Sequence, residues 1–185
     1  MITAGLLLAA GRSTRFGANN KLLAPLRGRP LLCWAAGTLG ALPLDHRIAV
    51  TADRRVAALL PGFDVVTTQA GSDQSASLRT GVARAQALGA DLLLVALADM
   101  PLITPDLLEG VLRRARRHGA AAASEGALRA PPAAFAAGHF DALLALTGDR
   151  GAGALLRDLP NETLEPAPGL LADVDTPADL AALRP

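Results

Sequence analysis

The sequence predicts an α/β fold in which a mostly parallel central sheet lies between two layers of helices. Short apolar runs such as LLLVALA alternate along the chain with segments of helical period, as expected for strands that are buried on both faces. A length of 185 residues suffices for one domain with a sizeable core, and no linker, repeat or low-complexity tract divides it. We therefore expect a single three-layer α/β/α domain over residues 1–185.

Apolar runs predict the strands of this sheet, and the segments between them predict helices. The expected strands are Ile2–Ala9, His46–Thr51, Asp64–Thr68, Asp91–Leu97 and Ala120–Ser124. The expected helices are Pro30–Leu42, with a proline in its first turn, Arg54–Leu60, Ser75–Leu88 and Pro105–His118.

The pattern becomes less regular after Ser124. The stretch GALRAPPAAF, residues 126–135, is expected to form a loop, because a central strand cannot carry a Pro-Pro pair. Beyond it we expect two short helices, a strand and a closing helix, at Asp141–Leu146, Arg150–Leu159, Glu162–Glu165 and Pro177–Leu183.

The composition excludes several classes of protein. A net charge of +1 produces no field that favours nucleic acid, and no apolar run is long enough to span a membrane. Cys33 is the single cysteine, so no intramolecular disulfide can form, and a reducing cytoplasm fits this chain. The histidines lack the spacing of zinc ligands. The run ITAGLLLAAG is interpreted as a buried strand, since no basic residue precedes it as in a signal peptide.

The loop after the first strand, AAGRSTRFGANNK, has the composition of an anion-binding loop. It stands at the carboxyl end of a strand, where open α/β sheets bind their ligands. Small residues let backbone N–H groups approach an anion, and further groups suited to phosphate come from Gly11, Arg12, Ser13, Thr14, Arg15 and Lys21. The loop matches neither the G-x-G-x-x-G fingerprint nor a P-loop. A plain loop with exposed basic side chains is the alternative.

Lys21 is the only lysine among 18 Lys and Arg residues. An ammonium is a compact charge with three rotatable donors, whereas a guanidinium is a planar fork. A site that reaches bridging and terminal phosphate oxygens therefore need not accept arginine. This supports the phosphate interpretation, although chance alone can also leave one lysine here.

Two acidic positions are candidates for a metal site. Asp99 follows LLLVALA at the tip of a predicted central strand. Its carboxylate is suited there to bind Mg²⁺ that also contacts substrate phosphates, and the alternative is that it only caps the next turn. Asp173 and Asp175 lie on one face of the extended stretch DVDTP, and either can supply a second carboxylate. The alternative is a helix start with Asp175 or Thr176 as its N-cap.

The predicted helix from Ser75 begins with polar side chains. Ser75 is expected to be its N-cap. Arg79 either reaches a phosphate or remains a solvated surface residue.

Several stretches, in this order, resemble the MobA-like nucleotidyltransferases: LLLAAGRSTRFG with KLLAPLRGRPLL, then GSDQSASLRTGV, LADMPLITPDLL and DVDTPADL. Together they extend from Leu6 to Leu180, nearly the whole chain. The likeness is closest to the molybdenum-cofactor cytidylyltransferase branch, since LAAG is similar to that branch, while the guanylyl branch usually has a second glycine at the position of Ala10. The resemblance implies a GT-A-like, Rossmann-like nucleotidyltransferase domain.

The resemblance also implies a reaction and a set of site residues. The reaction is transfer of CMP from CTP to the phosphate of molybdenum cofactor, giving molybdopterin cytosine dinucleotide and pyrophosphate, with Mg²⁺ or, since it accepts the same ligands, Mn²⁺. The implied catalytic residues are Lys21, Arg15 and Asp99, and the implied metal ligands are Asp99 and Asp175. The implied nucleotide-binding residues are Leu8, Ala9, Ala10, Gly11, Arg12, Ser13, Thr14, Gln69, Gln74, Ser75 and Ser77. Asp149 and Arg150, in TGDRGAGALL, are candidates for contacting the acceptor.

Other functions stay open from the sequence. LRAPPAAF at 128–135 departs from the glycine-histidine-proline type of segment in relatives, which puts acceptor recognition in doubt more than nucleotide binding. The alternatives are a guanylyl- or sugar/polyol-phosphate nucleotidyltransferase, or a non-catalytic molybdenum-cofactor chaperone for molybdenum hydroxylases. We expect a cytoplasmic monomer whose partners are CTP and molybdenum cofactor, with a molybdenum hydroxylase apoenzyme or its chaperone as a further candidate.

Overall fold

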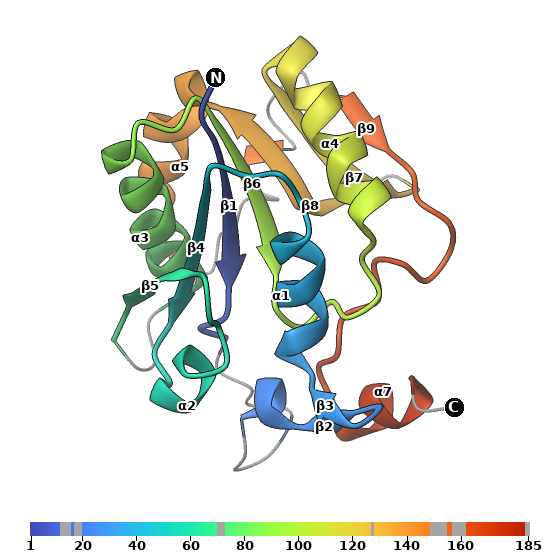
Figure 1. Ribbon diagram of the computed structural model, residues 1–185. Helices are drawn as coiled ribbons and strands as arrows, with labels where there is room; N and C mark the ends of the chain where they lie inside the picture. The colour runs from blue at the N-terminus through green and yellow to red at the C-terminus, as the bar shows by residue number, and fades with distance from the viewer. Residues whose placement is uncertain are drawn as a thin grey trace.

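The computed structural model of this protein has a central sheet between two layers of helices (Figure 1). It describes residues 1–11, 16, 20–69, 73–126, 128–148, 155–156 and 162–183. Within these residues seven strands form the main sheet in the order β5-β4-β1-β6-β8-β7-β9. Their bounds are β1 Thr3–Leu8, β4 His46–Thr51, β5 Asp64–Thr67, β6 Leu92–Leu97, β7 Ala120–Glu125, β8 Leu128–Ala136 and β9 Glu162–Leu164. Only the pairs that involve β8 are antiparallel, which confirms the mostly parallel three-layer prediction.

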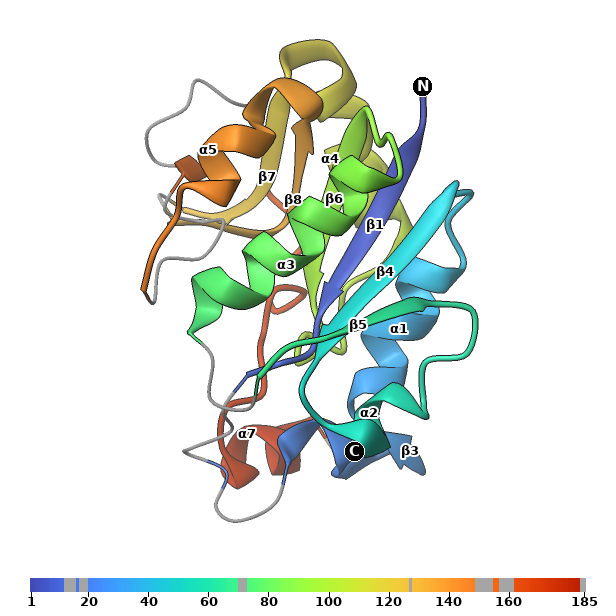
Figure 2. The ribbon, with the colours of Figure 1, turned by 90° about the vertical axis from the view of Figure 1, so that its left-hand side faces the viewer.

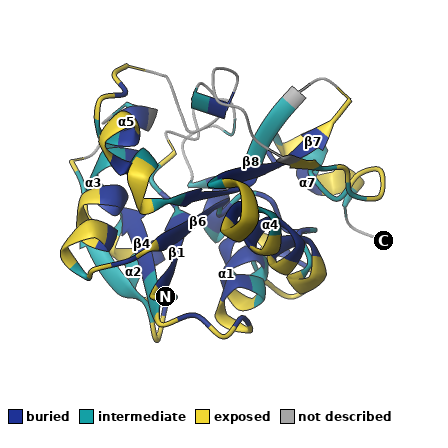
Figure 3. Cartoon of the chain, turned by 90° about the horizontal axis from the view of Figure 1, so that it is seen from above, coloured by how far each residue is buried: buried dark blue, intermediate teal, exposed yellow. Residues whose placement is uncertain are grey.

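Helices cover both faces of the sheet, and each face has its own apolar core. Helices α1 (Leu32–Gly40) and α4 (Pro105–His118) pack on one face, and α3 (Gln74–Ala87) and α5 (Phe140–Leu144) pack on the other (Figure 2). In β1, Leu7 belongs to the first core and Leu6 to the second, because successive side chains of a strand point to opposite faces. The outward sides of these helices are exposed (Figure 3). No helix within the described ranges is both long and apolar enough to span a membrane.

The smaller elements gather at the end of the sheet toward which the parallel strands run (Figure 1). They are the turn η2 (Lys21–Leu23), the hairpin of β2 (Pro25–Leu26) and β3 (Arg29–Pro30), α2 (Arg54–Ala57) and α7 (Pro177–Ala182). The short turn η3 (Ala137–His139) links β8 to α5. The carboxyl ends of the central strands are thus the part of the molecule where segments distant in sequence meet.

The prediction of a loop over residues 126–135 was wrong, since β8 runs through this segment between β6 and β7. Pairing with β6 begins only at Ala133. Pairing with β7 shifts register between Ala122, which faces Ala133, and Ala123, which faces Ala130. Pro131 and Pro132 therefore fall within the irregularity, where the ladder needs no N–H from them.

Two helix starts also differ from the prediction. Pro30 lies in β3, so α1 begins only at Leu32. Helix α3 begins at Gln74, and its N-cap is Asp73, whose carboxylate accepts a hydrogen bond from the backbone N–H of Ala76. Most of the helix expected over Arg150–Leu159 lies outside the described residues. Within that range only residues 155–156 are described, and both are helical. The remaining predicted elements are present, with ends that differ by up to three residues.

Gly81 lets α3 approach β1 closely, and its replacement by alanine should destabilise the protein. A Cβ at this position would collide with the side chain of Leu6, which is fully buried. We expect a loss of about 1–3 kcal/mol from overpacking, offset by less than about 1 kcal/mol of improved helix propensity. The measurement is urea denaturation followed by circular dichroism.

Gly37→Ala is the matched control. Gly37 lies in α1, and the position that an alanine Cβ would occupy there has no neighbouring heavy atom within 4 Å, so only the gain in helix propensity should remain. If Gly81→Ala were as stable as Gly37→Ala, close packing of α3 on β1 would not be the reason for the glycine.

Candidate functional site

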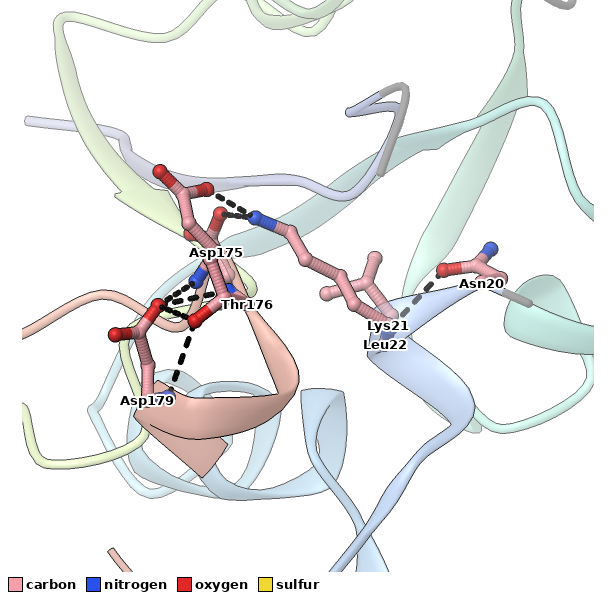
Figure 4. A network of polar contacts seen from close by, with 7 residues as sticks. Asn20, Lys21, Leu22, Asp175, Thr176 and Asp179 are labelled. Atoms are coloured by element: carbon pink, nitrogen blue, oxygen red, sulfur yellow. Dashed lines mark hydrogen bonds and ion pairs between the residues drawn. The ribbon is translucent and has the colours of Figure 1, made fainter. Parts of the chain in front are cut away.

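Lys21 lies between two carboxylates at the carboxyl end of the sheet (Figure 4). Its Nζ donates to Asp99 Oδ2 at 2.7 Å and to Asp175 Oδ1 at 2.8 Å. The two carboxylates stand 78 and 154 residues from Lys21 in the sequence. The structure therefore brings together the three residues that the sequence analysis placed at the centre of a metal and phosphate site.

The backbone around Asp99 and Asp175 fixes the two carboxylates near each other. Just before Asp99, the backbone N–H of Ala98 donates to Leu8 O of the neighbouring strand at 3.1 Å. The N–H of Val174 donates to Asp99 O at 3.0 Å, and the Val174 side chain is fully buried. This backbone hydrogen bond places the segment of Asp175 beside the end of β6.

Helix α7 holds Asp175 from its other side through a capping box. Thr176 is the N-cap, and its hydroxyl accepts from the Asp179 N–H. The Asp179 carboxylate accepts hydrogen bonds from Asp175 N at 3.1 Å, Thr176 N at 2.7 Å and Thr176 Oγ1 at 2.8 Å. Both sequence interpretations of DVDTP therefore apply, because Thr176 begins the helix while Asp175 turns its carboxylate to Lys21 (Figure 4).

The site combines one buried positive charge with several carboxylates, and these charges affect the pKa values of Lys21 and Asp173. Lys21 is only 5% exposed. Burial by itself lowers the pKa of Lys21, but the charge of Asp99 and the hydrogen bonds to Asp175 and Asp99 outweigh burial and hold the pKa above its usual value. Nearby, loss of hydration raises the pKa of Asp173, and the charges of Asp175 and Asp99 raise it further. The ammonium is thus fully charged at neutral pH in a cluster rich in negative charge.

The carboxylates fit a divalent cation. Asp99 Oδ1 is buried and has no hydrogen-bond partner among the described residues. Its other oxygen and one Asp175 oxygen already bind a cationic group, the ammonium. No described group of three or more His, Cys, Asp or Glu side chains could hold a metal by itself. A hard ion such as Mg²⁺, which takes one or two carboxylates and completes its shell with water and phosphate oxygens, suits this donor set.

The first loop is described only in part. Leu8 and Ala10 are half-buried, Ala9 is buried and Gly11 is exposed, so the chain leaves the core at this point. Among the described residues, no heavy atom lies within 4 Å of the position that a Cβ on Gly11 would occupy. Arg12, Ser13, Thr14 and Arg15 lie outside the described residues, as do the acceptor candidates Asp149 and Arg150.

The start of α3 is organised differently from the prediction. The hydroxyl of Ser75, fully buried, donates to the N-cap Asp73 at 2.8 Å and accepts from Arg79 Nη1 at 3.0 Å. Arg79 also donates to Leu146 O at 2.6 Å, so it joins α3 to the end of α5 and is not a free surface residue. The Ser75 hydroxyl is therefore bonded to other side chains of the protein in this structure. Gln69, another candidate for contacting the base, is exposed.

Of the other two base-contact candidates on α3, Ser77 is buried and Gln74 is the first residue of the helix. Contact of Gln69, Gln74, Ser75 and Ser77 with a nucleotide base stays a prediction.

Sequence reasoning missed Asn20 and Asp53, which form a hydrogen bond beside Lys21. Asn20 caps η2, since its Oδ1 accepts from Leu22 N at 3.0 Å, and a polar residue before an apolar turn is a signal for such a cap. The partner Asp53 lies 33 residues away, and no local pattern indicates that pairing.

Comparison with known proteins gives consistent results. The family model described as the MobA-like NTP transferase domain matches residues 5–164. The chain is 32% identical to the purine catabolism protein PucB of Bacillus subtilis, over 97% of this chain and 95% of that protein. It is 28% identical to a molybdenum cofactor guanylyltransferase of Rhodobacter capsulatus, over 98% of this chain and 94% of the other.

Among solved structures, the chain is similar to Rv0371c of Mycobacterium tuberculosis H37Rv. The identity is 28% and the TM-score is 0.87, over 99% of this chain and 98% of that chain. A structure of Rv0371c in complex with manganese matches with a TM-score of 0.85 and 27% identity, over the same shares of the two chains. These likenesses extend over whole chains and agree with the predicted nucleotidyltransferase fold.

Lys21 should stabilise the folded protein at neutral pH and lose this effect at alkaline pH. Because its folded pKa lies above the ordinary value of 10.5, its contribution is fully present below pH 10.5 and disappears as the pH rises through the folded pKa. We therefore expect the stability difference between the parent protein and Lys21→Met to shrink at alkaline pH. The measurement is the free energy of unfolding from urea denaturation across this range.

Both proteins should carry Cys33→Ser. Burial raises the pKa of the Cys33 thiol, and this too makes the free energy of unfolding fall as the pH rises. The chain has no tyrosine, so no phenol titrates in the same pH range as Lys21. A stability difference that stays constant from neutral to strongly alkaline pH would contradict the role given to the ammonium.

Proposed function

This chain belongs to the MobA-like NTP transferase family of nucleotidyltransferases, and we propose that it transfers CMP from CTP to the phosphate of molybdenum cofactor. The observation that carries the proposal is the cluster of Lys21, Asp99 and Asp175 at the carboxyl end of the sheet. It combines a cationic group for phosphate with two carboxylates for a divalent metal. The products are molybdopterin cytosine dinucleotide and pyrophosphate.

The chemistry needs no covalent intermediate with the protein. A phosphate oxygen of the acceptor forms a bond to the α-phosphorus of CTP, and the bond to the bridging oxygen of pyrophosphate breaks. The acceptor phosphate is already an anion, so no general base has to remove a proton. Catalysis then depends on in-line positioning and on neutralising the charge that develops on the phosphate oxygens.

Each proposed residue has a distinct task in this reaction. Asp99 and Asp175 would hold Mg²⁺ or Mn²⁺, which when bound neutralises charge on the phosphate oxygens. The orphaned Asp99 Oδ1 supports this assignment, and so does the manganese bound to the similar Rv0371c. Lys21 would then turn from the carboxylates to the α-phosphate. Gly11 and its neighbours would cradle the triphosphate, with Arg15 at the β,γ end.

A guanylyl transferase is the second candidate. It is favoured by the similarity, over nearly the whole chain, to a molybdenum cofactor guanylyltransferase. We place CTP first because Ala10 stands where the guanylyl branch usually has a second glycine, and the half-buried methyl group of Ala10 takes up room at the end of β1.

Loss of the ammonium should remove turnover while the fold remains. We expect Lys21→Ala to reduce the rate of pyrophosphate release from CTP by about 10²–10³, the usual effect of removing one transition-state donor. Lys21→Arg should restore little, because a planar fork does not replace a compact ammonium. The assay contains magnesium and molybdenum cofactor, and pyrophosphate is coupled to a colour reaction.

Arg113→Ala is the control, since Arg113 is an exposed cation on the surface of α4. Near-normal turnover of Lys21→Ala would rule out the role proposed for Lys21, and activity without any divalent metal would rule out the role of the carboxylates.

Nucleotide preference can be measured without the labile acceptor. A ligand that binds only the native state raises the melting temperature, and at a given ligand concentration the shift grows with the logarithm of its affinity. With magnesium present, we expect a larger shift with CTP than with GTP, and Ala10→Gly should increase the GTP shift relative to the CTP shift. A larger GTP shift in the unmodified protein would favour the guanylyl candidate, while no shift with either would contradict a triphosphate site.

A further inference from the structure

Asn20 connects the turn that carries Lys21 to a second strand end. Its Oδ1 accepts from the Leu22 N–H of η2 at 3.0 Å, and its Nδ2 donates to Asp53 Oδ2 at 3.1 Å. Asp53 stands just beyond the carboxyl end of β4. The side-chain amide of Asn20 therefore joins two segments: its oxygen bonds to the Lys21 turn, and its nitrogen bonds to Asp53 at the end of the sheet.

Asp53 is itself held firmly. Its Oδ1 caps α2 by accepting the Arg55 N–H at 2.9 Å, and its backbone N–H donates to Thr51 Oγ1 at 3.2 Å. The Arg55 guanidinium donates to both Asp53 oxygens, at 3.1 and 2.8 Å. These hydrogen bonds, first from Arg55 and then from Asn20, hold the pKa of the Asp53 carboxyl below its ordinary range. Asp53 is consequently an ionised, oriented acceptor at neutral pH.

The Lys21 side chain needs such an anchor because it has a flexible four-carbon stem. Leu22 fixes one side of the turn, since it is 3% exposed within the core that α1 and α4 share. Asn20 fixes the other side through Asp53. Both contacts hold the backbone of the turn, so the stem of Lys21 starts from a defined place from which its ammonium reaches Asp99 and Asp175.

We propose that Asn20 and Asp53 are positioning residues that hold the turn of Lys21 where its ammonium reaches the two carboxylates and, under the proposed function, the α-phosphate beside them. They act through the backbone of the turn and do not touch the reacting phosphates. Their importance for turnover rests on the proposed function, whereas their effect on the position of Lys21 does not. The proposal is therefore tested first by a measurement that involves no substrate.

The single lysine makes that measurement direct. Protein grown with ¹³C,¹⁵N-labelled lysine gives NMR signals from Lys21 alone. Two distinct signals for the ε-methylene protons indicate a fixed side chain, and one averaged signal indicates a mobile one. The control Arg54→Ala removes an exposed cation of the same helix α2 and keeps the hydrogen bonds of Asp53 to Arg55 and Asn20, so its Lys21 signals should match those of the unmodified protein.

Asn20→Asp is the decisive variant. Aspartate still caps η2, because it is as good an N-cap as asparagine, but it cannot donate to Asp53 and sets a second negative charge against it. We expect its ε-methylene signals to merge. With CTP, magnesium and acceptor, kcat should fall about tenfold or more while KM for CTP changes little, since a displacement of about 1 Å can cost 10²-fold in rate.

Circular dichroism checks that the variants are folded, and Asn20→Ser, which keeps a capping oxygen without a new charge, replaces Asn20→Asp if that variant unfolds. Folded variants whose Lys21 signals are unchanged would overturn the proposal, whatever their activity. Merged signals in a protein whose unmodified form transfers no nucleotide would support the positioning role and reject the proposed function instead.

Discussion

One ammonium between two carboxylates holds the functional end of this protein together. A hydrogen bond between backbone groups, Val174 N–H to Asp99 O, brings Asp99 and Asp175 side by side. The fold therefore concentrates negative charge, and Lys21 supplies the nearest compensation. Removing one partner from a buried ion pair leaves an uncompensated charge, which costs far more than the pair contributes as a whole. The ends of β6 and α7 and the turn η2 all depend on this contact.

The contact also explains why the chain keeps a lysine here. A guanidinium is planar and pairs best with one carboxylate through two parallel hydrogen bonds. An ammonium is compact and can donate in three directions, so it can bond to two carboxylates that come from different segments at 2.7 and 2.8 Å. The Lys21 side chain itself is nearly closed to solvent, which further favours the smaller group. Geometry at the carboxylates thus gives a reason for lysine that is independent of any phosphate.

The sequence predicted the parts of the structure that depend on local pattern. The runs that form β1 and β6 are apolar on both faces, and the strand positions were enough to name the loop after β1 and Asp99 after β6 as candidates. Asp53, just beyond the end of β4, was missed. Strand β8 could not be predicted, because two prolines normally exclude a central strand, and they are accommodated here by an irregularity of β8 at which its pairing with β7 shifts register. Likewise, Asp73 rather than Ser75 caps α3, and the Ser75 hydroxyl instead accepts from Arg79, which also donates to the distant Leu146. Long-range pairings of this kind leave no trace in local spacing.

The charge of the cluster constrains how a nucleotide can enter. Lys21 offsets only part of the negative charge that Asp99, Asp175 and the nearby Asp173 contribute, and the raised pKa of Asp173 reflects its two negative neighbours as well as lost hydration. A triphosphate that approached alone would be repelled by this excess of negative charge, and the half-buried positions of Asp99 and Asp175 reduce the screening of that repulsion by solvent. A triphosphate that arrives with a divalent cation brings the charge that the carboxylates lack, and it releases the ammonium to interact with phosphate. Metal and nucleotide should therefore bind with positive coupling, so that each raises the affinity for the other by the same factor.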